Sequence, residues 1–180
     1  DTNHECNPGY LCITGASKPY GNDLTNIKQC DPGNYCPKGA TVETPCPIGT
    51  YNPVPAQRDC FACPKGKWCD VTGLAAPNNC PLGYYCTTGT ANTDNRIQCP
   101  SGTYANDINL GDVEQCLPCP PGFYCPLGTP TPTLQCDAGF YCAINAQTAQ
   151  DATQTHQIGS EINGKCPKGF YCPLGTVAPL

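Results

Sequence analysis

Two C-x-x-C pairs, Cys60/Cys63 and Cys116/Cys119, are the residues in this sequence whose spacing best suits chemistry. Thiols at this spacing bind zinc or cycle as a redox couple. The two pairs lie 53 residues apart within repeated segments, however, and no His is near either of them. The high cysteine content also indicates an oxidising compartment. We therefore expect these four residues to form disulfides rather than a metal or redox site.

An acidic segment, NDINLGDVE at residues 106–114, faintly resembles a calcium-binding loop. It offers side-chain oxygens from Asp107, Asn109, Asp112 and Glu114. It lacks the full alternation of oxygen ligands that calcium loops have. A solvated acidic loop is the favoured interpretation.

The sequence shows no recognisable catalytic constellation. His4 and His156 are its only histidines, and neither lies in a pattern of Ser, Cys or Asp typical of nucleophilic catalysis. We expect a surface role for both. The protein is expected not to be an enzyme and to have no cofactor or metal.

The composition indicates how such a chain could be held together. Its 180 residues include 18 Cys, 19 Gly and 21 Pro, while Leu, Ile, Val and Phe are too sparse for an ordinary apolar core. An even number of cysteines at this density is typical of an extracellular disulfide scaffold. We expect all eighteen to be bonded: Cys6, Cys12, Cys30, Cys36, Cys46, Cys60, Cys63, Cys69, Cys80, Cys86, Cys99, Cys116, Cys119, Cys125, Cys136, Cys142, Cys166 and Cys172.

The charge and hydropathy exclude some partners. The formal net charge is −5 without a basic cluster, so nucleic acid and anionic membranes are poor partners. No apolar run is long enough to span a bilayer, which argues against direct membrane insertion. There is also no amino-terminal leader and no Met, so we interpret the chain as a mature or internal piece.

Internal repeats dominate the sequence. The string C-x-x-G-x-x-C occurs seven times, beginning at Cys6, Cys30, Cys63, Cys80, Cys119, Cys136 and Cys166. An aromatic residue precedes the second cysteine in all but the first copy, which has Leu11. A related string, C-P-x-G-T-Y, starts at Cys46 and Cys99, and corresponding cysteines recur every 50 to 56 residues.

Each string predicts a tight turn followed by a short extended segment. Pro presets φ at the second position of a β-turn and Gly is favoured at the fourth. The run from Gly to the aromatic residue and cysteine favours extended backbone, and so small hairpins. The aromatic side chain is expected to cover a neighbouring disulfide.

These features predict a small disulfide-rich repeat protein, an elongated rod of turns and short β-hairpins with little or no helix. We divide the chain into an N-terminal cysteine-rich half-module (1–45), two cysteine-rich repeats (46–98 and 99–142), and a polar insertion with a C-terminal half-module (143–180).

The strings CPIGTYNPVPAQRDCFACPKGKWC and CPSGTY…CLPCPPGFYC resemble the cysteine-rich repeats called ephrin-receptor-like or GCC2/GCC3 repeats, which are similar in spacing to tumour-necrosis-factor-receptor modules. The resemblance runs from Cys30 to Cys172. It implies an extended extracellular rod, as in receptors, adhesins and mastigoneme-like filament proteins. It leaves the task of the chain open.

The resemblance also implies a ladder of disulfides. In that ladder Cys46 pairs with Cys60 and Cys99 with Cys116. The remaining implied pairs are Cys63–Cys80, Cys69–Cys86, Cys119–Cys136, Cys125–Cys142, Cys6–Cys30 and Cys12–Cys36. The alternative is that every C-x-x-G-x-x-C closes on itself, which also uses all eighteen cysteines. We favour the ladder because small closed loops crosslink little chain.

Polar stretches rich in Thr and Pro are candidates for O-linked sugar, with ordinary loops as an equally weighted alternative. The candidate sites are Thr131, Thr133, Thr148, Thr153 and Thr155. No N-x-[ST] sequon occurs, so N-glycans are not expected.

Two function classes remain. One is a structural subunit or repeat segment of an extracellular filament or surface coat, and the other is the ligand-binding stalk of a receptor or adhesin. We prefer the filament because the loops read as uniformly small and polar. The ends carry weakly complementary charges, Asp1 and Glu5 against Lys165 and Lys168. We therefore expect copies to stack head to tail, either as consecutive segments of one long polypeptide or as separate subunits, with O-linked glycans as further partners.

Overall fold

The computed structural model describes residues 6–13, 27–91, 97–150 and 163–180. The chain divides into two compact units. Unit 1 is Asp1–Asn79 with Thr87–Arg96, and unit 2 is Cys80–Cys86 with Ile97–Leu180. Each unit is built from the same small element, a two-stranded antiparallel hairpin.

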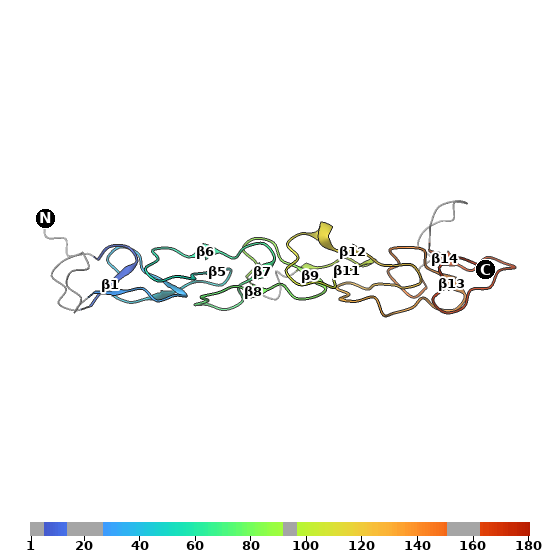
Figure 1. Cartoon of the computed structure of the whole chain (residues 1–180), viewed down its shortest axis with the longest axis horizontal. Helices are drawn as coiled ribbons and strands as arrows, with labels where there is room; N and C mark the ends of the chain where they lie inside the picture. The colour runs from blue at the N-terminus through green and yellow to red at the C-terminus, as the bar shows by residue number, and fades with distance from the viewer. Residues whose placement is uncertain (1–5, 14–26, 92–96, 151–162) are drawn as a thin grey trace. The chain divides into compact units, whose positions relative to one another are not determined.

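Unit 1 contains four of these hairpins (Figure 1). Their strands pair in sequence order, β1 with β2, β3 with β4, β5 with β6 and β7 with β8. The strand bounds are β1 Tyr10–Cys12, β2 Ile27–Gln29, β3 Asn34–Tyr35, β4 Thr44–Pro45, β5 Thr50–Tyr51, β6 Phe61–Ala62, β7 Lys67–Trp68 and β8 Asn78–Asn79.

Unit 2 contains three further hairpins, formed by β9 with β10, β11 with β12, and β13 with β14. The bounds are β9 Tyr84–Tyr85, β10 Ile97–Gln98, β11 Thr103–Tyr104, β12 Leu117–Pro118, β13 Phe140–Tyr141 and β14 Gly164–Lys165. A 3₁₀ turn, η2 at Val113–Gln115, precedes β12 (Figure 1). Among the described residues, η2 is the only helical element.

The disulfides bond mostly within each string. Seven of the nine join the two cysteines of one C-x-x-G-x-x-C, as in Cys30–Cys36 and Cys119–Cys125. The other two are Cys46–Cys60 and Cys99–Cys116. No cysteine is free.

The ladder implied by the family resemblance is therefore wrong for most of the chain. The pairs Cys63–Cys80, Cys69–Cys86, Cys119–Cys136, Cys125–Cys142, Cys6–Cys30 and Cys12–Cys36 are not formed, and only Cys46–Cys60 and Cys99–Cys116 agree with it. The physical reason is local. The turn at the central Gly reverses the chain and leaves the two flanking Cα atoms 5.5 to 6.3 Å apart, within ordinary disulfide reach.

Cysteines make up most of the buried hydrophobic residues, and a few small or aliphatic side chains complete three separate clusters. The expected small, disulfide-rich and helix-poor fold of turns and hairpins is thus confirmed. In the part of the chain that the structure describes, no helix has the length and apolarity to cross a membrane.

Candidate assembly surface

We call a module the segment that begins at the first cysteine of a C-x-x-G-x-x-C or C-P-x-G-T-Y string, and name it by that cysteine. Nine modules follow one another, beginning at Cys6, Cys30, Cys46, Cys63, Cys80, Cys99, Cys119, Cys136 and Cys166. The strings at Cys46 and Cys99 belong to the same series. Their sixth following residue is Asn52 or Ala105 where the others have a cysteine.

Consecutive modules within each unit are joined by the same four backbone hydrogen bonds. The interface between the Cys119 and Cys136 modules illustrates them. Gly122 donates its N–H to the Cys142 carbonyl and accepts from the Cys136 N–H, at 2.8 and 3.1 Å. The Cys125 N–H donates to Ala146, and the Asn145 N–H donates to the Cys119 carbonyl, at 2.8 and 3.0 Å. These bonds pair backbone N–H and C=O groups of both turns.

The second turn of each module was missed by the sequence analysis. It follows the second cysteine and supplies the N–H that binds the preceding module's first cysteine. The residue that supplies this N–H has a positive φ even where it is not Gly, as at Ala56, Asn109 and Asn145. Strings such as CTTGT (86–90) and CPLGT (125–129) both begin at the second cysteine of a module. Aligning them on that cysteine could have revealed the second turn.

The aromatic residue before the second cysteine packs against the next module. Tyr85 contacts the cluster that contains Cys99 and Cys116, and Tyr124 contacts the cluster that contains Cys136 and Cys142. Leu11, at the same position in the Cys6 module, is buried with Cys30 and Cys36. The expectation that these side chains cover a neighbouring disulfide is confirmed at these positions.

The central Gly of a module also lies against the module two places further along. A Cβ on Gly83 would stand 2.3 Å from the Gly128 carbonyl oxygen, and one on Gly122 would stand 2.7 Å from that of Gly175. Both distances are too short for any side chain. Each module is therefore in contact with its next two successors within a unit.

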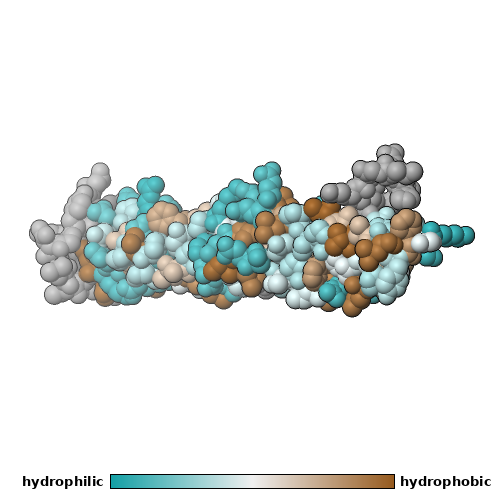
Figure 2. Space-filling model, turned by 45° about the vertical axis from the view of Figure 1, so that its right-hand side comes forward, coloured by the Kyte–Doolittle hydropathy of each residue, from teal (hydrophilic) through white to brown (hydrophobic). Residues whose placement is uncertain are grey.

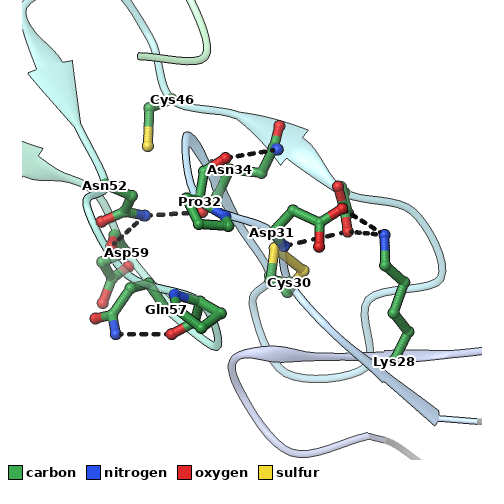
Figure 3. The surroundings of a disulfide bond; sticks show 12 residues. Lys28, Cys30, Asp31, Pro32, Asn34, Cys46, Asn52, Gln57 and Asp59 are labelled. Atoms are coloured by element: carbon green, nitrogen blue, oxygen red, sulfur yellow. Dashed lines mark hydrogen bonds and ion pairs between the residues drawn. A yellow bond between two sulfur atoms is a disulfide. The ribbon is translucent and has the colours of Figure 1, made fainter. Parts of the chain in front are cut away.

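Asn52 takes the place of the missing cysteine in the Cys46 module and is fully buried. Its side-chain amide donates to the carbonyls of Asn34 and Asp59, at 2.8 and 3.2 Å, and lies 3.8 Å from the Cys60 sulfur (Figure 3). The first of these bonds joins two modules. Asn52 thus connects neighbouring segments at a position where seven of the nine modules have a disulfide-bonded cysteine.

Substituting Asn52→Ala should lower the free energy of unfolding by about 1–3 kcal/mol, because the buried Asn52 side chain loses two hydrogen bonds, to the carbonyls of Asn34 and Asp59. Ala105 occupies the same position in the Cys99 module, so the Ala side chain fits such a site. Guanidinium titration of the oxidised chain, followed by fluorescence of the single Trp68, measures the loss. The control is Asn78→Ala, which removes an exposed hydrogen bond to Asp70. Equal losses for both variants would contradict the assigned role.

Several backbone groups of the Cys166 module, equivalent to those that join modules elsewhere, make no hydrogen bond to the described residues. Among the described residues, no hydrogen bond is made by the Gly169 N–H or carbonyl, the Cys166 carbonyl or the Cys172 N–H. Tyr171 is 70% exposed, although its counterparts Tyr85 and Tyr124 are only partly exposed. We call this set, Cys166, Gly169, Tyr171 and Cys172, the C-terminal face.

An apolar hollow borders the C-terminal face. It has a volume of about 350 Å³ and is lined by residues 173–178 and Leu180. Leu174 and Leu180 are 61% and 75% exposed. On the face that Figure 2 shows, hydrophobic residues lie in patches among hydrophilic ones.

The residues expected at the assembly ends are only partly placed by the structure. Lys165 and Lys168 are exposed on the Cys166 module. Asp1 and Glu5 lie outside the described residues, so their part of the charge complementarity stays a prediction. His4 and His156 also lie outside the described residues.

The two cysteines of each C-x-x-C pair are bonded to other cysteines and not to each other. Cys60 bonds to Cys46 and Cys63 bonds to Cys69, so the members of the pair belong to different disulfides, and Cys116/Cys119 behaves in the same way. In the described parts of the chain no three His, Cys, Asp or Glu side chains converge as metal ligands.

The acidic segment is a turn rather than a ligand cage. The Asp107 carboxylate accepts the Ile108 N–H at 2.7 Å, and the Gln115 side chain accepts the N–H groups of Gly111 and Asp112. The Asn109 N–H donates to the Cys80 carbonyl, so Asn109 belongs to the module interface.

The Lys28 ammonium lies between two carboxylates. Hydrogen bonds to Asp31 and to Glu43, at 2.6 and 2.8 Å, raise the pKa of Lys28 above its ordinary value (Figure 3). Lys28 and Asp31 are solvent-exposed and Glu43 is partly buried, so water and salt screen much of the attraction and it contributes little to stability.

Among the proposed glycosylation sites, Thr131, Thr133 and Thr148 are exposed and thus accessible. Thr153 and Thr155 lie outside the described residues. Glycosylation of these residues stays a prediction.

Comparison with known proteins finds no matching family model. The chain is 33% identical over 128 residues to ABC transporter G family member 25 of Oryza sativa subsp. japonica, which covers 69% of this chain and 10% of that protein. It is 32% identical over 95 residues to signal peptide, CUB and EGF-like domain-containing protein 2 of Danio rerio, covering 51% and 9%. The sushi, von Willebrand factor type A, EGF and pentraxin domain-containing protein 1 of Mus musculus is 33% identical over 111 residues, covering 58% and 3%.

The chain thus spans about a tenth or less of these relatives. The relatives with CUB, EGF-like and sushi domains, together with nine disulfides, indicate an extracellular or cell-surface role.

Proposed function

We propose that the chain is a structural segment of an extracellular filament or surface coat, in which modules stack head to tail. The observation that carries this proposal is the repeated four-bond backbone interface. The same bonds recur between consecutive modules in both units, although the side chains around them differ. A contact made by backbone groups propagates through any sequence that keeps the turns, and this suits a spacer of defined length.

The C-terminal face supports the head-to-tail part of the proposal. It offers the same backbone groups and the same aromatic position that internal modules use to hold a successor. A contact that repeats in the same direction from module to module does not close on itself, and generates an open array.

Negative-stain electron microscopy of native material tests the filament function. Threads that extend over micrometres, and that antibodies against this segment decorate along their length, are the expected result. Dispersed single particles that carry the epitope would instead support the stalk of a receptor or adhesin.

One observation favours that second function. The loop between Ala105 and Cys116 departs from the expectation of uniformly small, polar loops, because Ile108 and Val113 are exposed in it. A hollow of about 250 Å³ lies beside this loop, lined by Leu110, Leu117 and polar neighbours. Such a site suits an apolar side chain of a partner. Loss of partner capture from Leu117→Ser, with filaments unaffected, would favour the stalk.

We also propose that the modules are of the ephrin-receptor-like kind, on the cysteine strings already described. The proposal includes no enzymatic activity. Its support is the role of the cysteines, all of which are bonded in structural disulfides.

A further inference from the structure

We propose that the hollow of the Cys99 module binds a segment of a partner protein in which one apolar side chain has Lys or Arg beside it. This inference goes beyond the filament function, and it names the partner chemistry of the hollow on which the second candidate function rests. It applies to a receptor stalk, and equally to a filament that captures another protein along its side. All residues that line the hollow belong to unit 2.

The small side chain of Ala105 leaves room for the hollow. Ala105 lines it, and stands where the Cys46 module has Asn52. The carbonyl of each residue accepts the N–H of the central Gly of the preceding module, at 2.8 Å for Asn52 and 2.9 Å for Ala105. Asn52 fills its buried position with an amide that is bonded to two carbonyls, whereas Ala105 has only a methyl group there. The same backbone frame therefore has less filling in the Cys99 module.

The loop at residues 106–115 forms the walls of the hollow. Cys99–Cys116 closes this loop over 17 residues, and Cys46–Cys60 closes its counterpart over 14, so the loop of the Cys99 module is three residues longer. The Leu110 carbonyl accepts a backbone N–H from the Cys80 module at 2.8 Å. The Gln115 side chain accepts two backbone N–H groups of the loop itself. Because these bonds hold the loop in place, binding requires little further ordering of the protein.

The lining and the size of the hollow suit a single apolar side chain. Three of its six lining residues are apolar, namely the buried Ala105 and Leu110 and the exposed Leu117. Ile108 and Val113 are exposed on the same loop. The volume of about 250 Å³ lies below the roughly 300–1,000 Å³ of pockets that enclose whole small molecules. One side chain of a larger partner therefore fits, and its burial against these residues favours binding.

The charge of the loop favours a cation next to that side chain. Asp107 lines the hollow, and Asp112 and Glu114 belong to the same loop. One oxygen of the Asp107 carboxylate accepts the Ile108 N–H at 2.7 Å, which fixes the orientation of the carboxylate. Residues 97–150 contain no Lys or Arg, so this segment supplies no cation of its own. Lys or Arg on the partner provides the complementary charge, which speeds encounter and discriminates against an acidic partner.

NMR titration of the ¹⁵N-labelled, oxidised 180-residue chain with capped peptides tests the proposal. The peptide Ser-Lys-Leu-Lys-Ser should shift the amide signals of Asp107, Leu110 and Leu117 until the site is saturated. Ser-Lys-Ser-Lys-Ser lacks the apolar side chain and Ser-Glu-Leu-Glu-Ser reverses the charge, so each should bind about tenfold more weakly or worse. Equal binding of the three peptides, shifts confined to other residues, or no shift with the first peptide would overturn the proposal.

Two variants separate the filling of the hollow from its charge. Ala105→Asn should weaken binding of Ser-Lys-Leu-Lys-Ser about tenfold or more, because the added amide fills the hollow, and it should fold because Asn52 fits the equivalent position. Asp107→Asn keeps a side-chain oxygen and should weaken binding and reduce its dependence on salt. Asp137→Asn is the matched control, because its carboxylate lies outside the loop and accepts a different hydrogen bond. Binding as in wild type by either of the first two variants would overturn the proposal.

Dilution of the unliganded chain tests whether a second copy is the occupant. If the same amide signals shifted on dilution, copies of this chain would fill the hollow, and the proposed partner would be wrong. The outcome is also separable from the filament function. Native threads of a chain that binds none of the peptides would retain the filament and refute this site. Binding of Ser-Lys-Leu-Lys-Ser by a protein found only as dispersed particles would retain the site and refute the filament.

Discussion

Complete loss of structure is the expected result of reducing the nine disulfides. Loop-closure entropy assigns about 2 kcal/mol to each disulfide that closes a short loop of six residues, and about 3 kcal/mol to the loops closed by Cys46–Cys60 and Cys99–Cys116. Together these contributions exceed the whole stability of an ordinary domain, about 5–15 kcal/mol. The buried hydrophobic residues are mostly the cysteines themselves, so little apolar area remains to hold a reduced chain.

Far-ultraviolet circular dichroism and protease resistance, measured before and after a strong reductant, check this expectation. The control is the same protein treated with the oxidised form of the reductant, which should keep its spectrum and its resistance. Alkylation and mass measurement should find eighteen modified cysteines in the reduced sample and none in the control. Retention of the native spectrum by the fully alkylated chain would show that the backbone interfaces suffice without disulfides.

The short hairpins and the role of the aromatic residues could be predicted from the sequence because both are local consequences of residue type. C-P-x-G presets a turn, and a following aromatic residue and cysteine favour extended backbone. Strands such as β9 at Tyr84–Tyr85 follow the turn as expected. The division of the chain into 46–98 and 99–142 stays a prediction, although modules of the same kind start within both segments.

The disulfide pairing was predicted wrongly from the family resemblance because the stability argument neglected the backbone. Small closed loops such as Cys80–Cys86 crosslink little chain, and this favoured long-range pairs. The long-range cohesion instead comes from hydrogen bonds between turns, as between Gly83 and Ala105. These bonds depend on two turns per module, and only the first has a constant sequence signature.

Asn52 and Ala105 show why the site could be predicted only in part. Neither residue carries a signal by its type, and both are recognised only by their position six residues after a C-x-x-G cysteine. Once aligned, they identify the Cys46 and Cys99 modules as members of the series. The exposure of Tyr171 could not be predicted, because the sequence string around it is nearly identical to that around Tyr124.

The Gly83→Ala substitution is expected to destabilise unit 2 far more than Gly139→Ala. Both glycines hold the same position in their modules, with φ of +79° and +89°, so a Cβ imposes similar backbone strain of about 1–2 kcal/mol at each. Only Gly83 faces an obstacle, the Gly128 carbonyl oxygen at 2.3 Å from the Cβ position. Forcing that contact apart should cost roughly a further 1–3 kcal/mol, as overpacking does elsewhere.

Both variants lie in unit 2, so amide hydrogen exchange of the oxidised protein compares them directly. Gly83→Ala should speed exchange at the amides of Ala105, Asn109 and Thr129, which belong to the modules that the turns around Gly83 and Gly128 join. Gly139→Ala should leave those amides nearly unchanged at a concentration low enough to keep the chain monomeric. The difference between the two variants isolates the contact between modules two places apart, because the backbone strain is common to both. Equal exchange in the two variants would mean that stacking depends on adjacent modules alone, and the glycines would then be explained by their turns.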